Sequence, residues 1–184
     1  MRSKSRQSPG VAILASAFFV VGSPLLAATK TTVTAPKDFA TGINRIALVA
    51  DQCAPQLDCP DVLRRVTATM KSELKLEFVI VADTHVREAL FKLGATSFSK
   101  EHRAALGEAL NLDALMEIDV PFAERGDGYW GRQGSETKVE IRLVKPTGEV
   151  LMAGSGFGRP NNVVTSPERV ADRTIKEILE KAFR

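Results

Sequence analysis

Two short apolar runs joined by one amphipathic stretch constrain the fold of this chain more than any other feature. The segments 43–50 (INRIALVA) and 78–82 (FVIVA) contain apolar runs without the alternation of a strand that has one solvated face. Strands of this kind are buried on both faces, as in parallel sheets. The stretch between them begins at Pro60 and carries apolar side chains at steps of four residues: Val62, Val66, Met70 and Leu74. We therefore predict a β-α-β unit with a right-handed crossover.

The rest of the chain adds three helices and three strands. Helices are predicted at 86–93, ended by Gly94, between Ser99 and Asn111, and from Ser166-Pro167 onward. Strands are predicted at 114–121, 137–145 and 149–158, with a tight turn at 145–148 between the last two. The order β-α-β-α-α-β-β-β-α predicts an α/β (α+β) fold, in which helices pack on a single mixed sheet of about five strands.

Residues 1–27 have the composition of a secretory signal peptide. Three basic residues precede an apolar stretch at 11–21, and small residues suited to cleavage follow at Ala27 and Ala28. The apolar stretch is shorter than the ~20 residues that a membrane-spanning helix needs. We therefore predict general secretion into the periplasm, and the alternative is a leader that stays uncleaved and anchors the chain to the inner membrane.

The length of 184 residues suits one domain after this leader. Residues 43–184 are predicted to form a single α/β domain, and 28–42 either a flexible tether or an added edge strand. Beyond residue 27 the chain has 22 basic and 22 acidic side chains, because three of its 25 basic residues lie in the leader. This balance gives no support to nucleic-acid binding, which needs an excess of Lys and Arg.

The two cysteines, Cys53 and Cys59, lie in one Pro-containing loop. In an oxidising compartment such a pair is predicted to form a disulfide. The alternative is metal binding, but His85 and His102 are remote in sequence and fit no usual zinc spacing. We predict no metal site and no cofactor.

Four segments together resemble a known group of periplasmic domains. They are 46–49, 78–83, 105–115 (ALGEALNLDAL) and 142–151 (RLVKPTGEVL). The pattern is similar to the domain shared by the curli secretion channel CsgG, the N-terminal domain of TolB and the lipoprotein activators of penicillin-binding proteins, such as LpoB. The resemblance covers residues 43–184 and implies an anticodon-binding/TolB-N-like fold and a non-catalytic interaction role in the cell envelope. The lipid-modified Cys of curli channels is absent, and the segments are too short for their barrel hairpins.

Glu117 and Asp119 share one face of the strand predicted at 114–121 and could form a general acid/base pair. If that strand pairs with 137–145, Lys138 and Arg142 lie opposite them and form ordinary cross-strand ion pairs on a solvated face. We favour the ion pairs over a hydrolase. His85 and His102 are expected at the surface, without a nucleophile signature beside them.

Three alternating glycines, Gly154, Gly156 and Gly158, lie on one face of the strand predicted at 149–158. Their spacing does not match a phosphate-binding loop, and the position of Ser155 among them does not match a nucleophile elbow. Alternating glycine in a strand instead leaves one bare face that another backbone can approach closely.

The loop 124–134 holds the only tyrosine and the only tryptophan of the chain, Tyr129 and Trp130, between Arg125 and Arg132. Aromatic and Arg side chains dominate binding hot spots, so these four residues are candidates for partner binding. The alternative is a Gly-rich hairpin whose aromatic side chains fold back on the sheet.

These features predict a non-catalytic periplasmic adaptor or scaffold that assists an outer-membrane secretion or surface-polymer assembly system. Its expected partners are envelope proteins, including an outer-membrane complex and further copies of itself. The alternative function is activation of a peptidoglycan synthase (a penicillin-binding protein).

Overall fold

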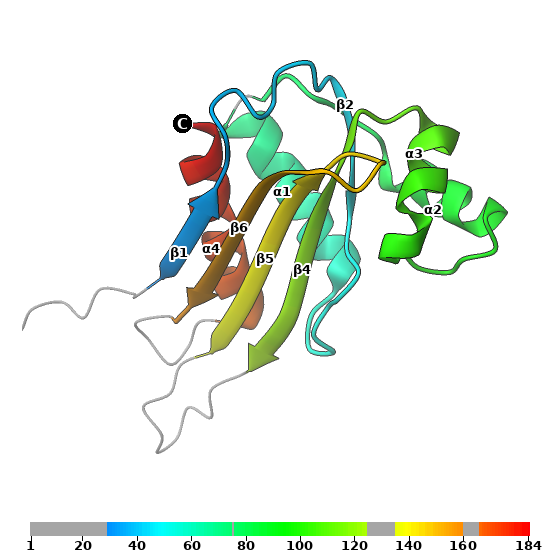
Figure 1. Ribbon diagram of the computed structural model, residues 1–184. Helices are drawn as coiled ribbons and strands as arrows, with labels where there is room; N and C mark the ends of the chain where they lie inside the picture. Colours follow the sequence, from blue (N-terminus) through cyan, green and yellow to red (C-terminus); the bar gives the residue numbers. More distant parts are fainter. Residues whose placement is uncertain (1–28, 75, 125–134, 160–165) are drawn as a thin grey trace, which may run out of the picture.

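The computed structural model describes residues 29–74, 76–124, 135–159 and 166–184 (Figure 1). Its four helices are α1 (Cys59–Ser72), α2 (Asp83–Lys92), α3 (Arg103–Leu110) and α4 (Pro167–Phe183), and a 3-10 turn (Lys100–His102) precedes α3. The strands are β1 (Lys30–Thr34), β2 (Arg45–Val49), β3 (Val79–Ile80), β4 (Ala114–Glu124), β5 (Glu136–Val144) and β6 (Val150–Gly158). They form one six-stranded mixed sheet in the order β1-β6-β5-β4-β2-β3. The predicted fold class is confirmed.

The sheet has a parallel part and an antiparallel part. β2 pairs in parallel with β3 on one side and with β4 on the other, which confirms the predicted β-α-β unit. β4, β5, β6 and β1 pair antiparallel with one another in that order. The connection from β1 to β2 therefore passes along one end of the sheet to reach the parallel part (Figure 1).

The sixth strand lies in the segment before the predicted domain. β1 pairs with β6 over all five of its residues, and the hydroxyl groups of Thr32 and Ser155 lie 3.0 Å apart across the pair. Lys181 of α4 also donates to the carbonyl oxygen of Thr31 at 3.1 Å. Of the two alternatives for 28–42, the structure thus has the added edge strand over Lys30–Thr34.

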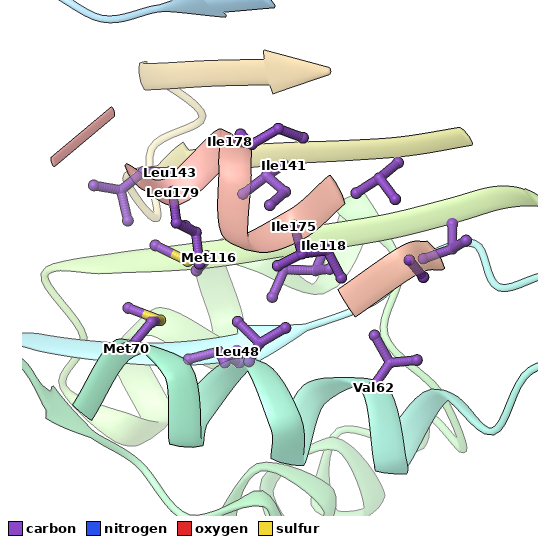
Figure 2. Close-up of a cluster of buried hydrophobic side chains, with 14 of the residues drawn as sticks. Leu48, Val62, Met70, Met116, Ile118, Ile141, Leu143, Ile175, Ile178 and Leu179 are labelled. Atoms are coloured by element: carbon purple, nitrogen blue, oxygen red, sulfur yellow. The ribbon is translucent and has the colours of Figure 1, made fainter. Parts of the chain in front are cut away.

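Helices α1 and α4 cover one face of the sheet and bury the larger part of the core between them (Figure 2). Met70 of α1, Met116 of β4 and Ile178 of α4 are fully buried in this layer. An ion pair between Arg65 of α1 and Asp172 of α4, at 2.8 Å, ties the two helices together at their outer side.

Helix α4 packs against the bare glycine face of β6. A Cβ atom added at Gly154 would lie 2.3 Å from Cγ2 of Ile178, and one at Gly156 would lie 2.4 Å from Cγ2 of Thr174. Only glycine leaves room for the helix at this distance, because any side chain would overlap with α4. The prediction of a close approach is confirmed.

Helices α2 and α3 lie on the opposite face, over β2 and the beginning of β4, where Val49, Leu106 and Leu115 belong to a second buried cluster. Helix α3 also contacts the turn between β5 and β6, since a Cβ atom at Gly107 would lie 2.5 Å from Pro146. These two residues come from two of the segments that carry the family resemblance. Those two segments therefore contact each other in the fold.

One predicted strand differs in its environment. The segment 78–82 was expected to form a strand buried on both faces, but β3 has only two residues and lies at the edge of the sheet. Its Val79 side chain is 55% exposed. The expectation of full burial is wrong. An apolar run shows that both faces of the strand carry apolar side chains, but it does not show whether another strand pairs with its outer edge.

Candidate functional site

A buried cluster of charged side chains lies where α3, β4 and β5 meet. Glu117 of β4 is 1% exposed and accepts a hydrogen bond from Nε of Arg103 at 2.7 Å. Its second carboxylate oxygen lies 3.6 Å from Nε of Arg142, which is an ion pair without a hydrogen bond. A buried carboxylate is stable only when it is paired in this way.

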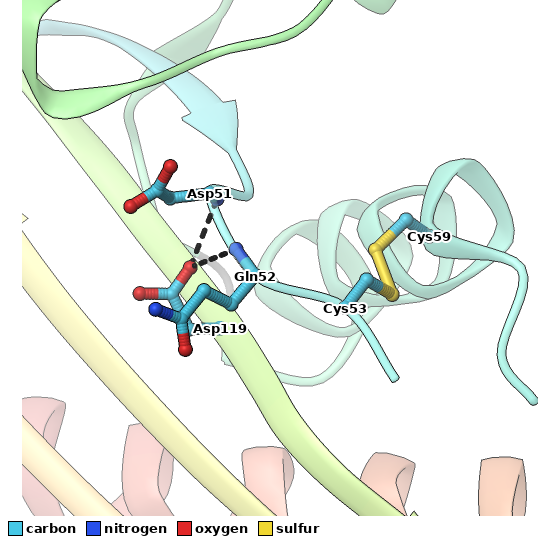
Figure 3. The surroundings of a disulfide bond; sticks show 5 residues. All are labelled: Asp51, Gln52, Cys53, Cys59 and Asp119. Carbon is cyan, nitrogen blue, oxygen red and sulfur yellow. Dashed lines mark hydrogen bonds between the residues drawn. A yellow bond between two sulfur atoms is a disulfide. The ribbon is translucent and has the colours of Figure 1, made fainter. Parts of the chain in front are cut away.

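Asp119, two residues further along β4, is the second carboxylate of the cluster. It is 4% exposed and accepts a hydrogen bond from Arg142 at 2.8 Å. Its other oxygen accepts the backbone N–H groups of Asp51 at 2.9 Å and Gln52 at 3.1 Å (Figure 3). Asp119 thus joins the segment that follows β2 to the middle of the sheet.

The disulfide lies directly beside this junction (Figure 3). Cys53 and Cys59 are bonded, with their Cα atoms 6.1 Å apart, as the sequence predicted. Cys53 forms an isolated parallel bridge with Val120, and Ala54 donates its backbone N–H to the carbonyl of Val120 at 2.8 Å. The disulfide therefore links the first residue of α1 to a segment that β4 already holds.

The expected cross-strand ion pairs are confirmed for Arg142, but the expectation that they lie on a solvated face is wrong. Arg142 does face Glu117 and Asp119, but both carboxylates are buried and Arg103 of α3 completes the cluster. Lys138 pairs instead with Glu140 on its own strand at 2.8 Å, and this hydrogen bond lowers the pKa of Glu140. Sequence alternation showed that the carboxylates share a face, but it carried no information on the helix that covers them.

This cluster has the geometry of a structural network. Each carboxylate is satisfied by hydrogen bonds and ion pairs, and neither lines the surface depression of about 320 Å³ that Arg142 borders. That depression is lined by Thr32 and Thr34 of β1, Glu140 and Arg142 of β5, and 153–155 of β6. It lies on the part of the sheet that α2 and α3 leave uncovered.

The part of this face that no described helix covers continues toward the far ends of the strands. One row across four strands holds Phe122, Lys138, Phe157 and Lys30. Phe122 is 38% and Phe157 37% exposed, and the guanidinium of Arg159 lies 5.7 Å from the ring centre of Phe157. A β-bulge between Asp119 and Phe122 shifts the alternation of β4, so the sequence pattern alone would place Phe122 on the other face.

The predicted partner-binding residues Arg125, Tyr129, Trp130 and Arg132 lie outside the described residues. The described strands on either side, β4 and β5, end and begin beside the exposed pair of phenylalanines. The loop therefore stays a prediction for partner binding.

The two histidines differ from each other. His85 is exposed, as expected. His102 is only partly exposed, and its Nδ1 lies 2.9 Å from the hydroxyl of Ser99 at the beginning of the 3-10 turn. Ser99 and His102 form a reciprocal cap of that turn, so His102 has a local structural role. No group of three metal-ligand side chains occurs among the described residues.

The architecture is that of an α+β domain with one mixed sheet, two helices on one face and two on the other. No model of a known protein family matches the chain, and no curated protein matches it in sequence. No described helix is long and apolar enough to cross a membrane.

Solved structures of PelC share this architecture. The PelC dodecamer from Paraburkholderia phytofirmans is 14% identical, with a TM-score of 0.57 over 85% of this chain and 99% of that chain. A variant of the same dodecamer is 13% identical, with a TM-score of 0.51 over 83% and 96%. The NMR structure of LpoB from E. coli is 9% identical, with a TM-score of 0.46 over 86% and 83%. At these identities the likeness to PelC shows the fold alone, and the resemblance to CsgG and TolB stays a prediction.

Proposed function

We propose that this chain is a non-catalytic binding protein of the cell envelope that assembles with further copies of itself and acts on other envelope proteins from the periplasm. The observation that carries the proposal is the likeness in fold to PelC over 85% of this chain and 99% of that chain, because that protein is a dodecamer. The buried carboxylates support the non-catalytic part of the proposal, because Glu117 and Asp119 form structural ion pairs with Arg103 and Arg142.

The proposed output is that of an adaptor in an outer-membrane secretion or surface-polymer assembly system. The face of the sheet that no described helix covers, with its two exposed phenylalanines, offers a surface near the ends of β4 and β5 that flank the predicted Tyr129–Trp130 loop in the sequence. Exposed aromatic side chains next to cationic ones are typical of protein-binding surfaces.

The test has two parts. Sedimentation of residues 28–184 at increasing concentration should show a multi-copy assembly. Site-specific photo-crosslinking from position 130 in intact cells should give an adduct to a second copy or to an envelope protein, whereas the same crosslinker at the exposed Glu88 of α2 serves as the control. A chain that stays monomeric and yields no adduct at position 130 would refute the proposal.

Activation of a peptidoglycan synthase is the second candidate, and it rests on the sequence resemblance to the activators of penicillin-binding proteins. It predicts that the purified chain raises the rate of glycan polymerisation by a penicillin-binding protein in vitro. An unchanged rate, with the self-assembly intact, would leave the adaptor function alone.

A further inference from the structure

A groove separate from the uncovered sheet face runs between α1 and the edge strand β3. Its volume is about 490 Å³, and the residues that line it include the apolar Leu48, Leu63 and Ile80. Leu63 and Ile80 are only partly buried there, although both pack against the main core. The groove is within the size range of specific binding sites, which combine an apolar floor with a few polar groups.

The backbone of β3 is open on the side of this groove. Val79 donates its N–H to Asn44 at 2.7 Å, and Val81 donates to Ile46 at 2.9 Å, so both residues are directed toward β2. Because alternate residues of a strand direct their N–H and C=O groups to opposite sides, those of Ile80 point away from the sheet. No described residue pairs with this outer edge of β3.

We propose that this groove binds an extended apolar peptide at the carboxyl terminus of a partner protein, which pairs with Ile80 as a seventh strand of the sheet. Main-chain hydrogen bonds at a sheet edge give affinity in this mode, and pockets for alternate side chains give specificity. One set of side chains would enter the groove onto Leu63 and Ile80, and the other set would cover Val79, which is 55% exposed. The inference rests on the proposed binding function and names a class of partner for it.

The charges along the groove set the direction of the peptide. Asp61 is already paired with Arg64 and Arg65, and Asp83 with Arg87 at 2.5 Å.

Two lining charges, Asp58 before α1 and Lys71 in its last turn, form no ion pair among the described residues. Since α1 leads from the end of β2 to the beginning of β3, Lys71 lies toward the beginning of β3 and Asp58 toward its end. A peptide whose carboxylate end faces Lys71 therefore runs antiparallel to β3.

The same two residues set the length of the peptide. Lys71 lies thirteen residues after Asp58, which corresponds to roughly 20 Å along the helix at 1.5 Å per residue. An extended chain covers roughly that distance with six residues at about 3.3 Å each. The groove thus fits a segment of six or seven residues with apolar side chains at alternate positions.

The test uses residues 28–184 and a library of seven-residue peptides with free carboxyl ends, in which positions 2, 4 and 6 are Val, Ile, Leu or Phe. Binding is followed by NMR on the isotope-labelled protein. We expect at least one peptide to bind below about 1 mM, with shifts at residues 79–82 and along α1, and slower exchange of the Ile80 N–H. A peptide N-methylated where it faces Ile80 should lose binding.

Two matched variants test the direction. Lys71→Glu should weaken the free-acid peptide about fivefold and leave its C-terminal amide unaffected, whereas Lys92→Glu, in the last turn of α2, should change neither. The proposal is overturned if no library member binds, if the shifts lie elsewhere, or if Ile80 exchanges as fast as before. Sedimentation and crosslinking at position 130 do not depend on this groove, so its failure leaves the proposed function standing.

Discussion

Asp119→Ala tests the central structural claim, that one buried carboxylate holds the disulfide segment onto the sheet. The substitution removes the acceptor of three hydrogen bonds, from Asp51, Gln52 and Arg142. A buried donor left without an acceptor lowers the free energy of unfolding by about 1–3 kcal/mol, and removing one partner of a buried ion pair lowers it by about 3–5 kcal/mol. These costs are not additive, and water can reach the exposed Gln52. We therefore expect a loss of about 3–5 kcal/mol in the free energy of unfolding.

Urea denaturation of residues 28–184 at neutral pH measures this loss as a shift in midpoint at constant slope. Asp119→Asn keeps an oxygen for the two backbone N–H groups but loses the charge and the oxygen that accepts from Arg142, so it should be less destabilising than Asp119→Ala. Glu140→Gln is the matched control, because Glu140 lies opposite Asp119 on β5 with its side chain 36% exposed. It should change the stability by less than about 1 kcal/mol. A loss under about 1 kcal/mol for Asp119→Ala would refute the reasoning.

Three further changes test other parts of the fold. Cys53→Ser opens the bond to Cys59 and should cost about 2 kcal/mol; combined with Asp119→Ala, the loss should differ from the sum of the two, because both changes release one segment. Gly154→Ala places a Cβ atom 2.3 Å from Ile178 and should cost about 1–3 kcal/mol by thermal denaturation. Adding Ile178→Ala to this variant should recover part of that loss. An unchanged thermal midpoint for Gly154→Ala alone would contradict the close packing. Asp113 accepts two backbone N–H groups at the beginning of β2, which lowers its pKa. Its contribution to stability is therefore present above pH ~4 and is lost as the pH falls through the folded-state pKa. The difference in the free energy of unfolding between the unsubstituted protein and Asp113→Asn should shrink over that range, and a constant difference would show that the carboxylate charge is not involved.

The sequence by itself determined the elements whose signals are local. Asn111 adopts the left-handed conformation with φ of 50° where α3 ends, and Ser166-Pro167 begins α4. The alternation of β5 predicted its two faces, because side chains of a strand point alternately to either side. The cysteine spacing predicted the disulfide, since a short loop leaves the two residues close together in any fold.

The tertiary structure decided which of these surfaces are covered. Alternation showed that Glu117 and Asp119 share a face, but Arg103 of α3 buries one of them and the segment after β2 caps the other. The position of a strand within the sheet also depends on pairing between distant segments, which placed β1 at one edge and β3 at the other. The open edge of β3 and its groove arise from that order, because whether a strand lies inside or at the margin of a sheet is a property of its neighbours and not of its own residues.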